Sequence, residues 1–388
     1  MQNKIWPNYS ENEIKKVIRV IKSGKVNYVN GKLGKKFENL FSKWVKRKYS
    51  VALANGTVAL ELAIKSLKLP PKSEILVTAR SFFSSASVIV RAGFVPKFLD
   101  VDLYTQNILI KDIKKKISKK TKAIICVHLA GNPCDMKNII NISKKYRLKI
   151  IEDCAQAHGA RIDEKIVGSF GDVSAWSFCN DKIISTLGEG GMVSTNNKKI
   201  YNYINSYKDH GLSLKKKKNL NQKFIYNKDF FGSNYRLTEV QSAIGIAQLL
   251  KINDTLKKRN YIAKKYIKIF EKFNNFFYFY KPPSNIKNSW YRFYVFIKKD
   301  LKNFQSIRDK IIYNLNKNGI LCYYGACPEI YLENAFKNSN YRSKKRLYNC
   351  SILGKTSIAL DINHTLSKKT ININSKKIYK VLKKLLYK

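Results

Sequence analysis

The sequence lacks several features that would assign it to a class at once. Its seven cysteines form no Cys-x-x-Cys pair and are odd in number, which predicts free thiols in a reducing compartment. Its four histidines, at positions 128, 158, 210 and 364, lie far apart, which argues against a metal site. No stretch of about 18 apolar residues occurs, and the N-terminus lacks the apolar core of a signal peptide. We therefore expect a soluble cytoplasmic protein without a metal or a membrane span.

Acidic residues are also scarce. The 26 Asp and Glu stand against 75 Lys and Arg, which gives a formal net charge of +49. The excess is mainly Lys, spread along the whole chain as an AT-rich genome would produce, whereas nucleic-acid surfaces concentrate charge and use Arg. We expect no nucleic-acid partner, although such a field attracts small anions. The run Lys215–Lys218 is predicted to be an exposed loop, and attraction of an anionic substrate is the alternative.

The order of apolar runs predicts an α/β protein. Short β-branched runs alternate with helical stretches between Ser50 and Thr195, as in a mainly parallel sheet between helices, and ligands gather at the carboxyl ends of such strands. The predicted strands are Ile75–Thr78, Val95–Leu99, Ala123–His128, Lys149–Ile151, Val173–Phe178 and Met192–Ser194. The predicted helices include Thr57–Leu67, Phe83–Arg91 and Met136–Tyr146.

The 388 residues are enough for two domains. Residues 237–273 are predicted to form one long helical region, and after Pro282-Pro283 the pattern changes to a smaller α+β segment. We predict a large domain over residues 1–250, which includes an N-terminal helical segment. A small C-terminal α+β domain with its connecting helix is predicted over residues 251–388.

Two neighbouring strand ends supply a lysine and a carboxylate. Lys182 follows the strand in Trp176-Ser177-Phe178-Cys179-Asn180-Asp181 and precedes Gly188-Glu189-Gly190-Gly191, and Asp153 ends the apolar run Ile150-Ile151. Pyridoxal phosphate (PLP) chemistry uses both groups, because a lysine amine forms the Schiff base and an acid keeps the pyridine nitrogen protonated. Taken singly, Lys182 could be one exposed lysine among many and Asp153 a helix cap. The prediction of a PLP site therefore depends on both residues following neighbouring strands.

Two other strand ends suit a phosphate and an aromatic ring. Asn55-Gly56-Thr57 opens a helix, where backbone amides bind phosphate and glycine permits close approach. The same tripeptide also serves as an ordinary capped turn. Phe82 follows another strand end and is either a ring that stacks on a planar cofactor or a core residue.

These segments occur in the order of one known family. From the N-terminus to nearly the end, the chain resembles the DegT/DnrJ/EryC1/StrS family of PLP-dependent nucleotide-sugar aminotransferases, which has the fold type I architecture. The matching blocks are Asn55 to Leu60, Ser81-Phe82, Ala92-Gly93, Phe98 to Asp102, Val127 to Gly131, Glu152 to Gly159, Gly168 to Asp172, Ser177 to Lys182, Gly188 to Gly191, Asp209-His210-Gly211, and Gly232 to Glu239 with Gln241.

The resemblance implies a role for individual residues. Lys182 would form the Schiff base and Asp153 would pair with the pyridine nitrogen. The other cofactor contacts are Gln156 at the ring hydroxyl, Phe82 stacked on the ring, and, around the phosphate, Gly56, Thr57, Ser177 and Asn234 from the neighbouring subunit. Shared active sites in a homodimer follow from that last contact.

The implied reaction is a two-stage transamination from L-glutamate to the ketone of a nucleotide-linked keto-deoxysugar, with Lys182 as the base that moves the proton. Lipopolysaccharide or other surface-polysaccharide synthesis is the implied context. The implied substrate contacts are Asn27, Tyr28, His158, Tyr323 and Glu329, and we interpret His158 mainly as structural.

Two features depart from the family pattern. Cys179-Asn180-Asp181 precedes the lysine where the family often has His-Pro, and one extra residue separates Lys182 from Glu189. Family members with histidine in place of the lysine are dehydratases, and Lys182 argues against that branch. Two other hypotheses stay open: a different PLP reaction on the same fold, such as dehydration or cyclitol amination, and a non-catalytic or nucleic-acid-binding protein.

Overall fold

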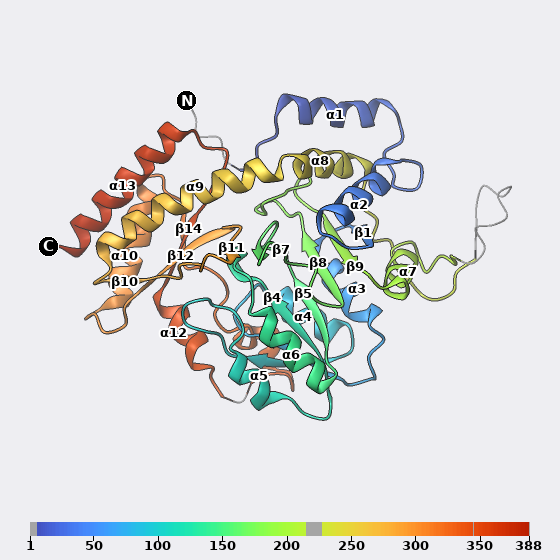
Figure 1. Cartoon of the computed structure of the whole chain (residues 1–388), viewed down its shortest axis with the longest axis horizontal. Coiled ribbons are helices and arrows are strands. Elements are labelled where there is room, and N and C mark those ends of the chain that lie inside the picture. Colours follow the sequence, from blue (N-terminus) through green and yellow to red (C-terminus); the bar gives the residue numbers. More distant parts are fainter. Residues whose placement is uncertain (1–5, 215–226, 344, 388) are drawn as a thin grey trace.

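A computed structural model of the chain describes residues 6–214, 227–343 and 345–387 (Figure 1). The run Lys215–Lys218, predicted to be a loop, lies outside these residues. The centre is a seven-stranded sheet. Its strands are, in spatial order, β1 (Tyr49–Leu53), β9 (Gly191–Thr195), β8 (Val173–Ser177), β5 (Lys149–Asp153), β4 (Thr121–Val127), β2 (Glu74–Thr78) and β3 (Val95–Leu99). Neighbours from β8 to β3 run parallel, whereas β9 is antiparallel to β1 and β8.

Helices cover both faces of this sheet. Val77 and Ile125 face one core, and their sequence neighbours Leu76 and Ile124 face the opposite core, as the alternation of side chains along a strand requires. The helices on the first face are α3 (Gly56–Ser66), α4 (Ser84–Arg91) and α7 (Lys198–Tyr207). Those on the second are α2 (Leu33–Trp44), α5 (Ile110–Lys116), α6 (Met136–Tyr146) and α8 (Glu239–Leu250). Burial on both faces explains the nearly continuous apolar runs, and the predicted α/β class is confirmed.

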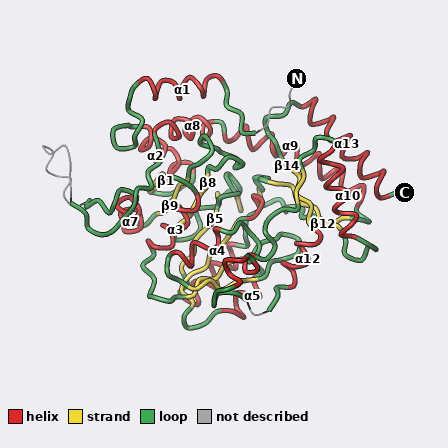
Figure 2. The backbone as a smooth tube through the Cα atoms, turned by 180° about the vertical axis from the view of Figure 1, so that it is seen from behind, coloured by secondary structure: helices red, strands yellow, loops and turns green. Residues whose placement is uncertain are grey.

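A second, antiparallel sheet lies at the other end of the molecule (Figure 2). Its strands are β10 (Phe277–Tyr278), β12 (Arg292–Ile297), β14 (Ser357–Asp361) and β13 (Cys322–Tyr323). It packs with α9 (Ile252–Phe270), α10 (Phe304–Lys317) and α13 (Lys368–Leu386) around a separate apolar core. A small three-stranded sheet of β11 (Ile286–Lys287), β6 (Arg161–Ile162) and β7 (Lys165–Ile166) joins the two parts.

The C-terminal part also contributes to the core of the large sheet. Ile330, Phe336, Cys350 and Leu353 pack there, from the segment that holds α11 (Asn334–Lys337) and α12 (Tyr348–Thr356). Three short 3-10 helices complete the description, at Leu129–Gly131, Glu271–Phe273 and Ile330–Leu332. The division of the chain into residues 1–250 and 251–388 stays a prediction.

The N-terminal helices pack against the helical region that connects the two parts of the molecule. α1 (Glu11–Lys22) and α2 both pack against α8. The carboxylate of Glu239 accepts hydrogen bonds from Leu33 N at 2.6 Å and Gly34 N at 2.7 Å, which satisfies the free amides at the start of α2. The helical region predicted as one unit is two helices, α8 and α9, with a break at Lys251 (φ −98°, ψ 0°). No helix in the described ranges is both long and apolar enough to span a membrane.

Candidate active site

Asp153 ends β5 beside the end of β8, at the carboxyl edge of the parallel strands. Its side chain is buried, with Oδ2 accepting from Ser85 Oγ at 2.9 Å and Oδ1 from Ala155 N at 3.1 Å. Burial raises the pKa of Asp153, whereas these hydrogen bonds lower it. Within the part of the chain that the structure describes, Asp153 forms no ion pair. A buried carboxylate without an ion-pair partner suits a ligand that carries a positively charged N–H group.

Lys182 lies in the loop that follows β8. Its Nζ donates to Asp181 Oδ1 at 2.8 Å and to Tyr291 OH at 3.3 Å. Burial lowers the pKa of Lys182, but Tyr291 and Asp181 raise it, and the resulting pKa lies above its ordinary value. The positive charge of Lys182 in turn lowers the pKa of Asp153, so the two groups act on each other across the site.

The start of α3 forms a cradle for an anion. The side chain of Asn55 accepts from Val58 N at 3.0 Å, which leaves the first two helix amides, of Gly56 and Thr57, without a partner inside the helix. A Cβ on Gly56 would lie 2.5 Å from Ser177 Cβ, so glycine lets the end of β8 seat directly against the helix start. Two free amides, a hydroxyl and a helix dipole therefore meet in one place, as a phosphate requires.

The whole chain has relatives of known structure and name. Residues 7–377 match the DegT/DnrJ/EryC1/StrS aminotransferase family. The chain belongs to this family. The aminotransferase from Psychrobacter cryohalolentis is 36% identical, with a TM-score of 0.95 over 98% of this chain and 99% of that one. PseC from Helicobacter pylori, an aminotransferase of pseudoaminic acid biosynthesis, is 25% identical with a TM-score of 0.89 over 98% of both chains.

A curated relative is also close in sequence. GDP-perosamine synthase of Escherichia coli O157:H7 is 41% identical over 246 residues, which span 63% of this chain and 64% of that protein. The chain thus aligns with a little under two thirds of that relative. The predicted family and the fold type I architecture are confirmed by these matches.

The structure gives the surroundings of the other predicted cofactor contacts. Gln156 Oε1 accepts from Ala130 N at 2.8 Å, which leaves its amide hydrogens to donate elsewhere. Phe82, just past the end of β2, is 67% exposed, which is unusual for so large an apolar ring and leaves its face open to a planar partner. Asn234 is exposed and pairs with Asp209 as an isolated β-bridge. The residues present fit PLP, and each individual role stays a prediction.

The predicted substrate residues are not all brought to the lysine. Tyr28 donates its hydroxyl to the Glu38 carboxylate at 2.9 and 3.0 Å, and Glu329 is buried in an ion pair with Arg346. Asn27 is exposed, and its side chain caps the backbone N–H of Val29 at 2.9 Å. These contacts give Tyr28 and Glu329 internal structural partners, and their substrate roles stay predictions.

His158 and Tyr323 lie nearer to the lysine. His158 is fully buried between the rings of Trp176 and Phe178, with centroids 5.4 and 5.7 Å away, and burial lowers its pKa to about 3. It is therefore a neutral ring in an apolar wall. Tyr323 is partly exposed, and the guanidinium of Arg292 lies between its ring and that of Tyr291, 5.3 and 5.0 Å from the two centroids.

Sequence reasoning missed three groups that contact the lysine loop. Tyr291 and Arg292 come from the start of β12, and Trp6 comes from the N-terminal segment. Asp181 was noted only as a departure from the family pattern. The adjacency of Asp181 to Lys182 was the one local signal available, since the other three lie more than a hundred positions from the lysine.

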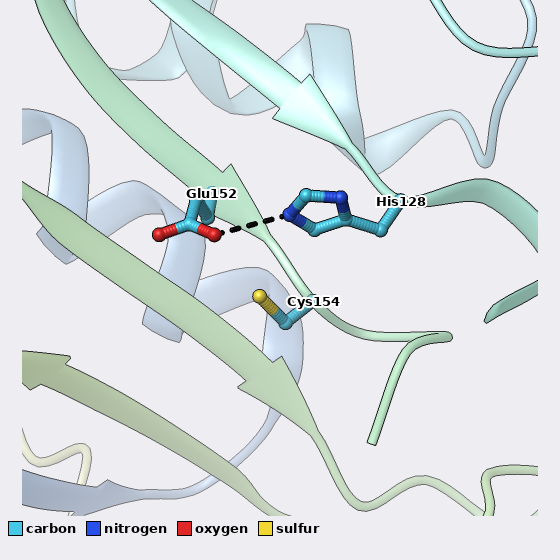
Figure 3. Close-up of side chains that lie close together, drawn as sticks. All are labelled: His128, Glu152 and Cys154. Atoms are coloured by element: carbon cyan, nitrogen blue, oxygen red, sulfur yellow. Dashed lines mark hydrogen bonds and ion pairs between the residues drawn. The ribbon is translucent and has the colours of Figure 1, made fainter. Parts of the chain in front are cut away.

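One buried trio in the described residues has the atom types of a metal site, namely His128, Glu152 and Cys154 (Figure 3). The backbone N–H of Cys134 donates to His128 Nδ1 at 3.0 Å, so the ring proton is on Nε2, which donates to Glu152 at 3.2 Å. Glu152 also accepts three backbone hydrogen bonds of 2.6 to 2.8 Å, from Gly168, Phe170 and Gly171. The ligand atoms of His128 and Glu152 are thus occupied in holding the loop before β8 against β5.

Proposed function

We propose that this family member is a PLP-dependent aminotransferase that moves an amino group from L-glutamate to the ketone of a nucleotide-linked keto-deoxysugar. The observation that carries the proposal is that buried Asp153, at the end of β5, feels the charge of Lys182, in the loop after the neighbouring strand β8, beside the free amides of α3. The names of relatives support a sugar substrate: one is GDP-perosamine synthase, and another, from Aneurinibacillus thermoaerophilus, is dTDP-3-amino-3,6-dideoxy-alpha-D-galactopyranose transaminase.

The cofactor is PLP, which supplies an electron sink for the bond broken at the donor Cα. Lys182 would anchor it, and Asp153 would keep its ring nitrogen protonated. Phe82 would supply a stacking face for the ring, and Gln156 would donate to its hydroxyl. Gly56, Thr57 and Ser177, with Asn234 of a second subunit, would hold the phosphate, which would make a homodimer the working unit.

The chain's own groups handle the proton. Lys182 Nζ would take the proton from the donor Cα and deliver it to C4′ of the cofactor, which a mobile amine held next to both carbons can do. Asp153 would remain a carboxylate once the protonated ring nitrogen lies against it, and Ser85 holds the carboxylate in place. The apolar wall of His158, Trp176 and Phe178 excludes water behind the site.

The proposed setting is the cytoplasm, where the amino sugar would feed surface-polysaccharide synthesis of the O-antigen type. The excess of lysine draws anionic nucleotide diphosphates toward the protein. The division into a large domain over residues 1–250 and a small one over 251–388 is part of this proposal, in which the small domain supplies Tyr291, a contact of Lys182.

The first experiment is a visible spectrum of the purified protein before and after L-glutamate is added. A yellow band that bleaches with glutamate, while 2-oxoglutarate forms, supports the proposal and leads to a screen of keto-sugars. Lys182→Ala should lose the band, and Lys257→Ala, a surface change, should keep it. A protein that stays colourless after PLP is supplied would contradict the proposal, and tight binding to DNA at physiological salt would then favour the nucleic-acid hypothesis.

A further inference from the structure

Asp181, the residue before Lys182, links the lysine to the smaller sheet. Its Oδ1 accepts from Lys182 Nζ at 2.8 Å, and its Oδ2 accepts from the hydroxyl of Tyr291. Arg292 lies 3.9 Å from Oδ2 and is itself paired with Asp361 at the end of β14. Positive and negative groups therefore alternate from the lysine to the edge of the smaller sheet.

Tyr291, which donates to Asp181 Oδ2, is held in place by its own backbone. Arg259 of α9 is buried and donates to the carbonyl oxygens of Trp290 at 3.1 Å and Tyr291 at 2.9 Å. Tyr291 N donates in turn to Ala130 O at 3.0 Å. Because these bonds fix where Tyr291 lies, its hydroxyl can hold the Asp181 carboxylate in one orientation, and little side-chain freedom is lost when the lysine binds to it.

Asp181 is the charged group that most directly stabilises the ammonium form of Lys182. Asp181 and Tyr291 contact Nζ directly, Asp153 acts on it from the end of β5, and His158 lies behind it as a neutral ring. Among the described carboxylates, Asp181 is the one that forms an ion pair with Lys182. The Lys182 side chain is only 16% exposed, whereas that of Asp181 is 43% exposed, so water screens the ion pair from the Asp181 side and leaves part of its effect on the proton affinity of Lys182.

We propose that Asp181 is a positioning residue that, oriented by Tyr291, stabilises and holds in place the ammonium form that the free Lys182 amine becomes when it takes up a proton. The amine gains one proton, from solvent in the cofactor-free protein and from the donor Cα in the proposed reaction, while Asp181 stays a carboxylate. For catalysis the inference rests on the proposed function, because a lysine that keeps its proton in a fixed place is ready to return it to substrate. The ion pair itself does not depend on that function.

The test measures the proton affinity of Lys182 directly. The full-length protein, stripped of cofactor, is acetylated with limiting acetic anhydride over a range of pH, and mass spectrometry follows the peptide that contains Lys182. Only the neutral amine reacts, so the profile gives its apparent pKa. In Asp181→Asn, which keeps the size and removes the charge, Lys182 should react about tenfold faster below its pKa, since an opposite charge at this distance shifts a pKa by about one unit or more.

A matched control is available on α10. Asp309 accepts from the adjacent Arg308 at 2.8 Å, and its side chain is 49% exposed, close to the 43% of Asp181. Asp309→Asn should leave the Lys182 profile unchanged. Circular dichroism and thermal unfolding of each variant show that the fold is kept, which separates a changed profile from unfolding.

Tyr291→Phe tests how the carboxylate is held. It removes the hydroxyl and keeps the ring, so it should shift the profile in the same direction by less. The double variant with Asp181→Asn should shift the profile by less than the sum of the two single changes, because only the direct contact of Tyr291 with Lys182 is then left to lose. A wild-type profile in Asp181→Asn would overturn the inference, and additive effects in the double variant would overturn the part assigned to Tyr291. Because no substrate is used, a protein without transaminase activity could still show the shift, so the two proposals fail separately.

Discussion

The indole N–H of Trp6 donates to the carbonyl oxygen of Lys182 at 2.8 Å, across 176 positions of sequence. The same indole lies 4.3 Å from the ring of His364, whose Nδ1 is 3.1 Å from the guanidinium of buried Arg259. Nearby, Tyr9 OH accepts from Leu187 N at 3.0 Å. The N-terminal segment therefore fastens the lysine loop at two points and ties it to the smaller part of the molecule.

Trp6→Phe should loosen the lysine loop. The change removes one partly buried hydrogen bond and keeps an aromatic ring against His364, so we expect a loss of about 0.5–1.5 kcal/mol in the free energy that holds the loop. The measurable result is faster release of PLP from the loaded protein on dilution, with a small fall in thermal midpoint. Tyr104→Phe, an exposed tyrosine of the large part, is the control and should release PLP at the wild-type rate. Equal release rates in Trp6→Phe and wild type would contradict this role.

Gly56→Ala should weaken the phosphate cradle. The added Cβ would lie 2.5 Å from Ser177 Cβ, so either the helix start or the end of β8 must move. Overpacking of this kind costs about 1–3 kcal/mol. Affinity for PLP, measured by titration of the cofactor-free protein, should fall more than thermal stability does.

A second glycine separates crowding from backbone strain. Gly319 has a φ of +75°, and no atom lies within 4 Å of the place that an added Cβ would occupy, so Gly319→Ala is strained only through its backbone. It should lower the free energy of unfolding by about 1 kcal/mol, seen as a modest fall in the thermal midpoint, and leave PLP affinity unchanged. Equal losses of PLP affinity in the two variants would show that the close approach of Gly56 to Ser177 is unimportant.

Asp153→Asn should separate stability from function. Burial raises the pKa of Asp153 in the folded, cofactor-free protein. A raised pKa means that folding is favoured while the group is protonated and loses that advantage as pH rises through the folded-state pKa. The neutral amide should therefore unfold at a higher temperature than wild type near pH 7, and the difference should vanish in acid.

The same variant should transaminate poorly, because an amide cannot keep the ring nitrogen protonated. A thermal midpoint that is unchanged at pH 7, measured without cofactor, would contradict the claim that the Asp153 carboxylate is held at a cost. Retention of full activity with glutamate would contradict its proposed place at the ring nitrogen.

The sequence predicted those parts of the site that follow directly from a strand. Asp153 ends an apolar run and Ser177 ends another, and because both strands are buried and parallel, their ends had to meet. Gly56 was found for a similar reason, since Asn55-Gly56-Thr57 marks a helix start. In each case a local pattern fixed the element, and the element fixed the position of the side chain.

The remaining contacts had no local pattern. Tyr291 and Trp6 reach the lysine only because two separate parts of the chain pack together, and nothing around either residue indicates where it will lie. The break at Lys251 was missed because the apolar spacing continues through it. Tyr28 and Glu329 were assigned by analogy to the substrate, whereas their partners Glu38 and Arg346 lie 10 and 17 positions away and could not be paired from periodicity.

Lys208→Met should destabilise the protein strongly. Lys208 is buried and donates to Glu38 Oε1 at 2.7 Å, while Glu38 also accepts from Tyr28 OH and from Ala52 N. Removing the lysine leaves a carboxylate buried without its cation, which costs about 3–5 kcal/mol in unfolding free energy measured with urea. The control is Lys257→Met, because Lys257 is 81% exposed and 3.8 Å from Asp254, so its loss should cost at most about 1 kcal/mol. A second change, Glu38→Gln in the Lys208→Met background, should recover part of the lost unfolding free energy, because it removes the buried charge that has no partner. If nothing is recovered, packing around Lys208 stabilises this part of the fold and the charge pair does not.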